Sequence, residues 1–372
     1  MKIAILTFSR SINYGGSLQT YALQTYLNKI GNVAIEIDYS NGKKIEHKNF
    51  LYAARSWIWQ SFVRPFFVDS LRSEKTVKFH KEFINYTDRT YHSGTELSKD
   101  PIECDAFIVG SDQVWNPPHV RWDKVWFLPF TDKLKLSYGA SFGCSEISAK
   151  FSDFCMPLIN NIDFVSVREE TGKELIISKL NDKPVSVVMD PVFLLTKNDW
   201  EKIAVLPNFQ KYVLSYYLPG DTAVEKQINR QALNYAKKKG LILINLGKRE
   251  YEKLFFNKSN VYGIGPREFL GLISNAEAVF TNSFHGTAFS LIFKKHFLTI
   301  IDNKNNKKGL STRMTDLLTR IDMEKAFIEA HETAFLDPVI ITDFSQKKLA
   351  IEIENSKFFL EEALRKSDEK TM

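Results

Sequence analysis

Short apolar runs rich in β-branched residues alternate along this chain with longer segments whose apolar residues have helical spacing. Residues 3–8 predict a buried strand, residues 18–30 predict a helix that Gly31 ends, and residues 33–37 predict the next strand. Residues 13–17, which contain adjacent glycines, are expected to form the turn before the helix. A strand, a helix and a second strand in this order are typical of a parallel sheet of the α/β class.

The same alternation continues along the chain and divides into two sets. Residues 46–90 have a mostly helical pattern and interrupt the first set. We expect an α/β protein with two Rossmann-like domains facing a cleft, residues 1–200 and 201–343, and a C-terminal helix in residues 344–372 that packs back on the first domain. Further strands are predicted at residues 106–109, 134–138, 164–167, 185–188, 212–217, 241–246, 278–280 and 297–301.

The composition excludes several classes of protein. No run of 18 or more apolar residues exists, so no membrane span is predicted, and the N-terminal apolar run is too short for a signal peptide. Three cysteines fit no metal-binding spacing and indicate reduced thiols in the cytoplasm. The net charge of +6 is compatible with anionic substrates, but no basic stripe with interleaved aromatics predicts nucleic-acid binding. We expect neither a metal ion nor a bound cofactor.

The first candidate site follows the first predicted strand. In open parallel sheets, ligands bind beyond the carboxyl ends of the strands. Asn13, Gly15, Gly16 and Gln19 lie at such an end. Glycines that open a helix allow close backbone approach, and the helix N-terminus offers free N–H groups to an anion. The segment is either a ligand contact or only a tight turn.

The second candidate site follows the apolar run at residues 106–109. Ser111, Asp112, Gln113 and Trp115 come directly after it. Asp112 is a candidate general base or hydroxyl-orienting group, and Trp115 is a candidate platform for a sugar ring. The alternative is a turn that begins at the aspartate and caps a helix.

Arg168 ends the apolar run at residues 164–167. A guanidinium at the end of a buried strand needs an anionic partner. That partner is either a bound phosphate or carboxylate, which fits the two-pronged guanidinium, or an internal carboxylate such as Glu169 or Glu170.

His285 lies between the predicted strand at residues 278–280 and the helical pattern that starts at Gly286. Ser283 and other small polar residues surround it, so we expect it at a helix N-terminus that faces the cleft. A helix N-terminus disfavours imidazolium, and a bound dianion would restore it. We interpret His285 as a catalytic or donor-binding group, with Ser283 and Gly286 as substrate contacts.

A basic loop and an aromatic segment complete the candidates. Lys307, Lys308 and Arg313 precede a helical pattern and are either anion ligands or a solvated run of charge. Residues Phe50 to Phe67 mix aromatics with arginines. This segment is a peripheral membrane contact, a helix packed on the domain, or a lid over the cleft.

The motifs taken together resemble the polysaccharide pyruvyl transferase family. Each is short, but their order and spacing cover nearly the whole chain. They are Tyr14-Gly15-Gly16-Ser17-Leu18-Gln19, Gly110-Ser111-Asp112-Gln113-Val114-Trp115, Tyr138-Gly139-Ala140-Ser141-Phe142-Gly143, Val165-Ser166-Val167-Arg168-Glu169, Asp190-Pro191 and Ser283-Phe284-His285-Gly286.

The resemblance implies a fold similar to GT-B glycosyltransferases, with the acceptor on the first domain and the donor on the second. It also implies transfer of a pyruvyl group from phosphoenolpyruvate to a saccharide as a ketal. The acceptor would belong to a cell-surface polysaccharide precursor, and a polyprenyl-diphosphate-linked one would place the protein at the inner face of the membrane. His285 and Arg168 inherit the family's donor-site roles by motif match, and Asp112 would act on the acceptor hydroxyl.

One position departs from the family pattern. Some members carry arginine two residues before the histidine, where this chain has Ser283. Arg313, Lys307 and Lys308 are alternatives for the missing charge. Two other functions stay open at this point: a nucleotide-sugar glycosyltransferase of the same architecture, and a non-catalytic glycan-binding module.

Overall fold

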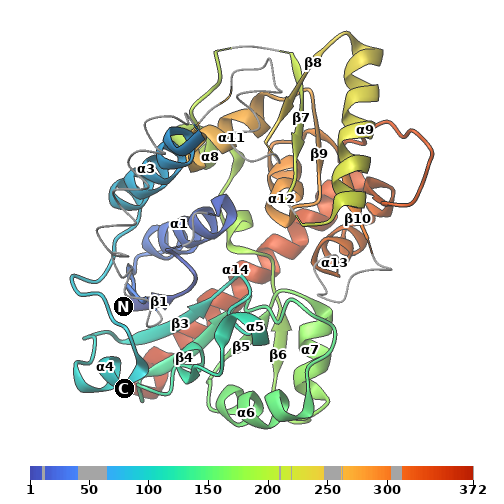
Figure 1. Ribbon diagram of the computed structural model, residues 1–372. Coiled ribbons are helices and arrows are strands. Elements are labelled where there is room, and N and C mark those ends of the chain that lie inside the picture. Colours follow the sequence, from blue (N-terminus) through green and yellow to red (C-terminus); the bar gives the residue numbers. More distant parts are fainter. Residues whose placement is uncertain are drawn as a thin grey trace, which may run out of the picture.

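The computed structural model describes residues 1–10, 13–40, 65–208, 211–218, 220–246, 261, 263–302 and 312–371. Most of the aromatic segment from Phe50 to Phe67, and the loop with Lys307 and Lys308, therefore lie outside the described residues. The strands form two separate parallel sheets with helices around them, which confirms the predicted α/β class (Figure 1). None of the described helices is long and apolar enough to cross a membrane.

The first sheet has the strand order β2-β1-β3-β4, all parallel. A parallel pair, β5 and β6, extends it, because single bridges join Leu136 to Phe164 and Ala140 to Val167. All five residues of β3 are buried, as expected for a strand covered on both faces. The strands are β1 (Lys2–Leu6), β2 (Val33–Glu36), β3 (Ala106–Gly110), β4 (Leu134–Tyr138), β5 (Val165–Val167) and β6 (Val185–Val187).

Helix α1 (Tyr14–Lys29) corrects the predicted turn at residues 13–17. Gly15 and Gly16 lie in the first turn of the helix, and Asn13 is its N-cap, since its side-chain oxygen accepts the Gly15 N–H at 3.1 Å. The other elements of this half are α3 (Pro65–Phe83), α4 (Gly94–Lys99), α5 (Pro117–Val120), η1 (Lys124–Phe127), α6 (Ala149–Asn160), α7 (Glu170–Ile177) and η2 (Pro191–Leu194).

The second sheet has the order β11-β10-β9-β7-β8 and is also parallel. Its edge strand β11 was not predicted, because three residues are too few to show a periodic pattern. The strands are β7 (Tyr212–Tyr216), β8 (Ile242–Asn245), β9 (Ala278–Thr281), β10 (His296–Ile301) and β11 (Phe327–Glu329). The helices are α8 (Lys197–Ile203), α9 (Thr222–Lys239), α11 (Pro266–Asn275), α12 (Phe284–Ile292) and α13 (Thr312–Arg320), with η3 (Glu324–Ala326) before β11.

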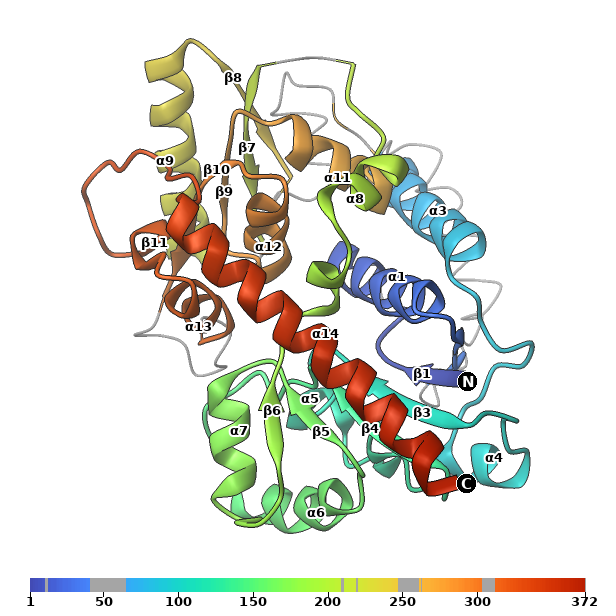
Figure 2. The ribbon, with the colours of Figure 1, turned by 180° about the vertical axis from the view of Figure 1, so that it is seen from behind.

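Helix α14 (Asp343–Thr371) runs from the second sheet across the back of the first (Figure 2). The Ser356 hydroxyl accepts the Met189 N–H at 2.8 Å, and the Tyr26 hydroxyl donates to Glu361 at 2.6 Å. Leu360, on the same helix, is fully buried in an apolar core that includes residues of both sheets. This shared core holds the carboxyl ends of the two sheets in a fixed relation.

Candidate active site

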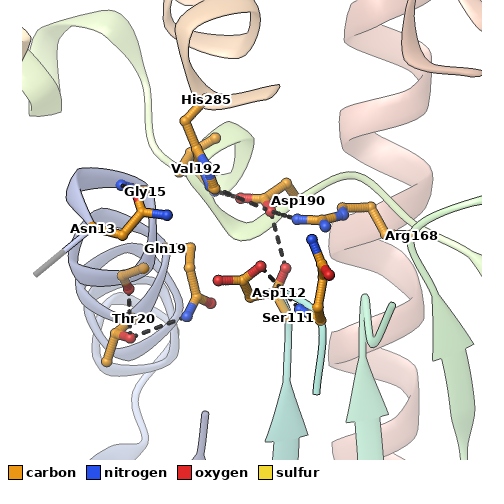
Figure 3. A network of polar contacts seen from close by, with 12 residues as sticks. Asn13, Gly15, Gln19, Thr20, Ser111, Asp112, Arg168, Asp190, Val192 and His285 are labelled. Carbon is orange, nitrogen blue, oxygen red and sulfur yellow. Dashed lines mark hydrogen bonds and ion pairs between the residues drawn. The ribbon is translucent and has the colours of Figure 1, made fainter. Parts of the chain in front are cut away.

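Asp190 lies at the centre of a buried polar network (Figure 3). Its Oδ2 accepts from Arg168 Nη1 at 2.6 Å and from the Ser111 hydroxyl at 3.0 Å. Its Oδ1 accepts the Val192 N–H at 3.1 Å, where Asp190 caps η2. The three donors follow β3, β5 and β6, so the network ties together three strand ends of the first half.

His285 enters this network from the other half of the molecule. It lies in the first turn of α12, whose N-cap Ser283 accepts the Gly286 N–H through its side chain. His285 Nε2 is 3.8 Å from Asp190 Oδ2, and the histidine is buried. The predicted helix N-terminus is therefore present. His285 and Arg168 are not across a cleft from each other, however, because both approach the same carboxylate.

Gly15 provides the space for the His285 ring. A Cβ atom built at Gly15 would lie 2.0 Å from His285 Nδ1, far inside van der Waals contact. The first turn of α1 therefore packs directly on the imidazole, and only glycine permits that approach. Gly15 of the sequence motif thus makes room for a histidine that lies 270 residues further along the chain.

Charge states in the network follow from burial and proximity. Burial lowers the pKa of His285, which outweighs the opposing effect of Asp190, so the ring is neutral in the protein alone. Burial by itself raises the pKa of Asp190, but its interactions with His285, with the permanently charged Arg168 and with the Val192 N–H more than offset burial, so the pKa is lowered and the carboxyl stays ionised. An arriving anion would shift the balance at His285 toward imidazolium.

Arg168 is almost fully buried and has two internal partners. Besides Asp190, its Nε donates to Glu169 Oε1 at 3.1 Å, and its guanidinium lies 4.5 Å from the centre of the Phe284 ring. The internal-carboxylate alternative is thus observed. Its Nη2 nevertheless has no hydrogen-bond partner among the described residues, so the N–H groups of this nitrogen are left for a ligand.

Arg313, in the first turn of α13, brings a second buried guanidinium to the site. With its amide oxygen turned toward the arginine, Gln113 accepts from Arg313 Nη1 at 3.2 Å and Nη2 at 3.0 Å. Burial and the charge of Arg168 lower the pKa of Arg313 to about 10, so it remains protonated at neutral pH. Arg313 thereby joins the second half of the molecule to the end of β3.

Three buried nitrogen atoms of this site lack a hydrogen-bond partner within the described part of the chain: Arg168 Nη2, His285 Nε2 and Arg313 Nε. Buried donors are rarely left unpaired, because each one loses the hydrogen bonds that water supplied. An anion with several oxygen atoms would satisfy such a set. The arrangement is therefore suited to bind a small anionic molecule beside a histidine.

The family follows from a comparison that covers most of the sequence. The family model described as polysaccharide pyruvyl transferase matches residues 13–305. The chain belongs to the polysaccharide pyruvyl transferase family. It is therefore a transferase, and a polysaccharide acceptor is implied by the family.

The solved structures that resemble this pyruvyl transferase share little sequence with it. A UDP-GlcNAc 2-epimerase from Methanocaldococcus jannaschii is 14% identical, with 95% of this chain and 92% of the other covered, at a TM-score of 0.48. The heptosyltransferase WaaC from E. coli is 12% identical, with 98% and 100% covered, at a TM-score of 0.44. Likenesses at this level carry no argument about function. No curated protein sequence matches the chain.

The structure also corrects the role predicted for Trp115 in this transferase. The indole is fully buried, its N–H donates to the Trp126 carbonyl oxygen at 3.0 Å, and its ring packs on Phe127 and Phe142. It therefore cannot serve as a sugar platform. The run of polar residues around it suggested exposure, but the chain turns at Asp112, which has a positive φ of 64°, and the indole points into the core.

Other predicted contacts support the site from behind. The Gln19 amide is fully buried and donates a hydrogen bond to the Thr7 hydroxyl at 2.9 Å. The Ser111 hydroxyl donates its hydrogen bond to Asp190. Gly286 is close-packed, since a Cβ there would lie 2.5 Å from the Thr281 hydroxyl. Asp112 differs from these residues, because it is half-buried and lines a cavity.

Asp190 is the residue at the centre of the candidate site to which the sequence alone assigned no role. The sequence showed it only as the first half of an Asp-Pro pair after a predicted strand. Its importance comes from contacts with Ser111, Arg168 and His285, which lie 79, 22 and 95 residues away in the sequence. Its position at a strand end was the one signal that pointed to it.

Proposed function

We propose that the chain transfers the pyruvyl group of phosphoenolpyruvate to a saccharide of a cell-surface polysaccharide precursor and closes it into a ketal. The observation that carries the proposal is the set of unpaired buried nitrogen atoms on Arg168, His285 and Arg313. Phosphoenolpyruvate presents a phosphate and a carboxylate close together, and two guanidinium groups and an imidazole complement that charge. Arg313 supplies the cation that some family members carry at the position of Ser283.

His285 is the proposed general acid. Protonation of the phosphoenolpyruvate methylene carbon gives a methyl group and oxocarbenium character at the neighbouring carbon, to which a saccharide hydroxyl adds. The ring is neutral before the donor arrives, so the dianion both binds and raises the pKa of its acid. Asp190 stays ionised, orients Arg168 and stabilises the imidazolium form of His285.

Asp112 is the proposed base for the acceptor hydroxyl. It is half-buried at the end of β3 and is held in a left-handed backbone conformation, a conformation that non-glycine residues adopt mainly at turns and functional sites. After the first hydroxyl has added, the phosphate leaves with the C–O electron pair, and a second hydroxyl of the same sugar closes the ketal. The sum is one ketal and one inorganic phosphate for each phosphoenolpyruvate.

The deciding experiment combines the protein with phosphoenolpyruvate and a panel of lipid-linked saccharides. We expect inorganic phosphate release and a saccharide whose mass has increased by one pyruvate ketal. Release of a nucleoside diphosphate from a nucleotide sugar, without any ketal, would contradict the proposal. No step is assigned to a metal ion, so EDTA should leave the rate unchanged.

The acceptor is proposed to be linked to a polyprenyl diphosphate, and the protein to work in the cytoplasm at the inner face of the membrane. This part of the proposal rests on the aromatic segment from Phe50 to Phe67 as a peripheral contact. Binding to anionic liposomes, measured with and without aromatic-to-serine substitutions in that segment, tests it. Equal binding by both forms would contradict membrane contact there.

A further inference from the structure

A cavity of about 510 Å³ opens at the carboxyl edge of the first sheet. It lies where the strand order β2-β1-β3-β4 reverses direction, between β1 and β3, because the chain leaves β1 toward β2 and returns on the other side to β3. Such reversal points are where open α/β sheets bind ligands. Residues that follow β1, β2 and β3 all contribute to its wall, among them Ser9, Asn13, Ser40, Asp112 and Gln113.

Three aromatic residues line the cavity, of which Phe8 is half-buried, while Trp126 and Tyr39 are buried and hold it in place from behind. The Trp126 ring meets Phe8 edge to face at 4.6 Å between ring centres, and Tyr39 at 5.6 Å. The Tyr39 hydroxyl donates to Asp123 at 2.5 Å, which holds the ring. Aromatic rings beside hydroxyl, amide and carboxylate groups suit the apolar faces and hydroxyls of a pyranose.

The two arginines on the rim of the cavity differ in their partners. Arg10 forms an ion pair with Asp38 and also donates to Thr90 at 3.2 Å, so its charge is balanced. Arg121 is exposed, and no ion pair joins it to any residue that the structure describes. Asp123, the acidic residue nearest to it in sequence, is engaged with Tyr39. The rim therefore carries one exposed arginine without an ion-pair partner in the described part of the chain.

The backbone fixes Arg121 at this rim. Arg121 and Trp122 both have left-handed backbone angles, with φ values of 49° and 63°. The Trp122 ring packs against Phe151 at 5.4 Å and Phe154 at 5.2 Å, which anchors the turn. Arg121 is thus held at the cavity by its anchored neighbour and not by a partner of its own.

The cavity adjoins the buried donors of the active site. Asp112 and Gln113 line it, and Gln113 also accepts from Arg313. A ligand that reaches Asp112 would present its hydroxyls to the anion site, while its far end would lie toward Arg121. The two sites are separate in their residues and joined through the end of β3.

We propose that this cavity binds the acceptor as an acidic saccharide, with a sugar ring beside the half-buried Phe8 and a phosphate or carboxylate facing Arg121. The inference rests on the proposed function, since it names the acceptor class of that reaction. It assigns recognition of the negative charge to Arg121 and leaves the reacting hydroxyls next to Asp112.

The test measures binding in the absence of turnover. Glucose 1-phosphate, glucuronic acid and methyl glucoside are titrated into the full chain and followed by saturation-transfer NMR. We expect at least one of the two acidic probes to bind about tenfold more tightly than the neutral one, because a charge-assisted hydrogen bond stabilises only the acidic probes. The acidic probe that binds identifies phosphate or carboxylate as the recognised group.

Two variants sharpen this test. Arg121→Asn removes the charge, and asparagine tolerates the left-handed backbone. This variant should bind the acidic and the neutral probes with about equal affinity. Lys124→Gln, an exposed residue three positions further that does not line the cavity, should keep the preference. Equal binding of all probes by the unaltered chain, or an unchanged preference in Arg121→Asn, would overturn the inference.

Competition with the donor separates this inference from the proposed function. Saturating phosphoenolpyruvate should leave acidic-probe binding unchanged, because the probe occupies a different site. Displacement of the probe would place it at the donor site and overturn the inference. Acidic-probe binding that depends on Arg121, found together with no ketal formed from any saccharide, would contradict the proposed function and still support the assignment of the cavity.

Discussion

At the scale of single residues, the site depends on groups that complete one another across the two halves of the chain. Asp190 balances Arg168, and Gly15 makes room for His285. None of these relations is local in sequence. For each of them we expect a substitution at the site to change activity or stability more than the same kind of substitution elsewhere in the chain.

We expect His285→Ala to lower turnover by about 10²- to 10⁴-fold, the usual contribution of a general acid. Steady-state phosphate release measures it. His331→Ala, in a loop outside the site, is the matched control and should retain full turnover. Normal turnover by the His285 variant would remove this residue from the mechanism.

Gly15→Ala should lower turnover by about 100-fold while the protein stays folded, because the new methyl group displaces the His285 ring. Gly94→Ala is the control, since a Cβ there meets only ordinary contacts, the nearest at 3.8 Å from Val125. Turnover and circular dichroism are compared for both. Full activity in Gly15→Ala would show that the imidazole is not held by this contact.

Asp190→Asn should lower the free energy of unfolding by about 3–5 kcal/mol, because it leaves the Arg168 charge buried with one partner fewer. Asp337→Asn breaks an exposed ion pair with Lys238 and should cost no more than about 1 kcal/mol. Urea unfolding measures both. Equal losses would mean that the buried network does not depend on this carboxylate.

At the scale of elements, the first turn of α1 is held from two directions, by His285 in front and by α3 behind. His80 of α3 lies with Nε2 2.8 Å from the Ser17 hydroxyl. Burial lowers the pKa of His80 from 6.5 to about 4. Protonation of His80 would place a charge in this buried contact, which makes the packing of these two helices sensitive to acid.

Stability should fall as pH decreases from 6.5 to 4, because the unfolded chain takes up a proton that folded His80 excludes. Over that range His80 changes the free energy of unfolding by at most about 3 kcal/mol. Unfolding by urea at several pH values measures the slope. His80→Gln should flatten it, and His331→Gln should not; an unchanged slope in His80→Gln would exclude this group as its source.

At the scale of the whole molecule, α14 and the shared core make the two sheets one cooperative unit. Leu360→Ala should lower the free energy of unfolding by about 2–5 kcal/mol, because truncating this fully buried side chain leaves a cavity in that core. Phe358→Ala, two residues earlier and 67% exposed, should change stability by less than about 0.5 kcal/mol. Circular dichroism and tryptophan fluorescence should report one transition; two separated transitions would contradict a shared core.

The sequence by itself determined the class of the fold and the places where polar groups leave the strands. Hydrophobic periodicity is a local property, so it predicted β4 at its observed bounds and α14 closely. It placed the start of α1 too late, because two glycines look like a turn until Asn13 caps them into a helix. The sequence also predicted an exposed Trp115, because the polarity of the neighbouring residues does not reveal the bend of the chain at Asp112.

Only the tertiary structure decided which of those groups meet. Asp190 has no local pattern that marks it, yet it joins Ser111, Arg168 and His285. The space at Gly15 and the contact between Gln113 and Arg313 arise where helices and loops of the two halves pack together. Such contacts depend on distances through space between residues far apart in the chain. A single sequence encodes these distances only through the complete fold.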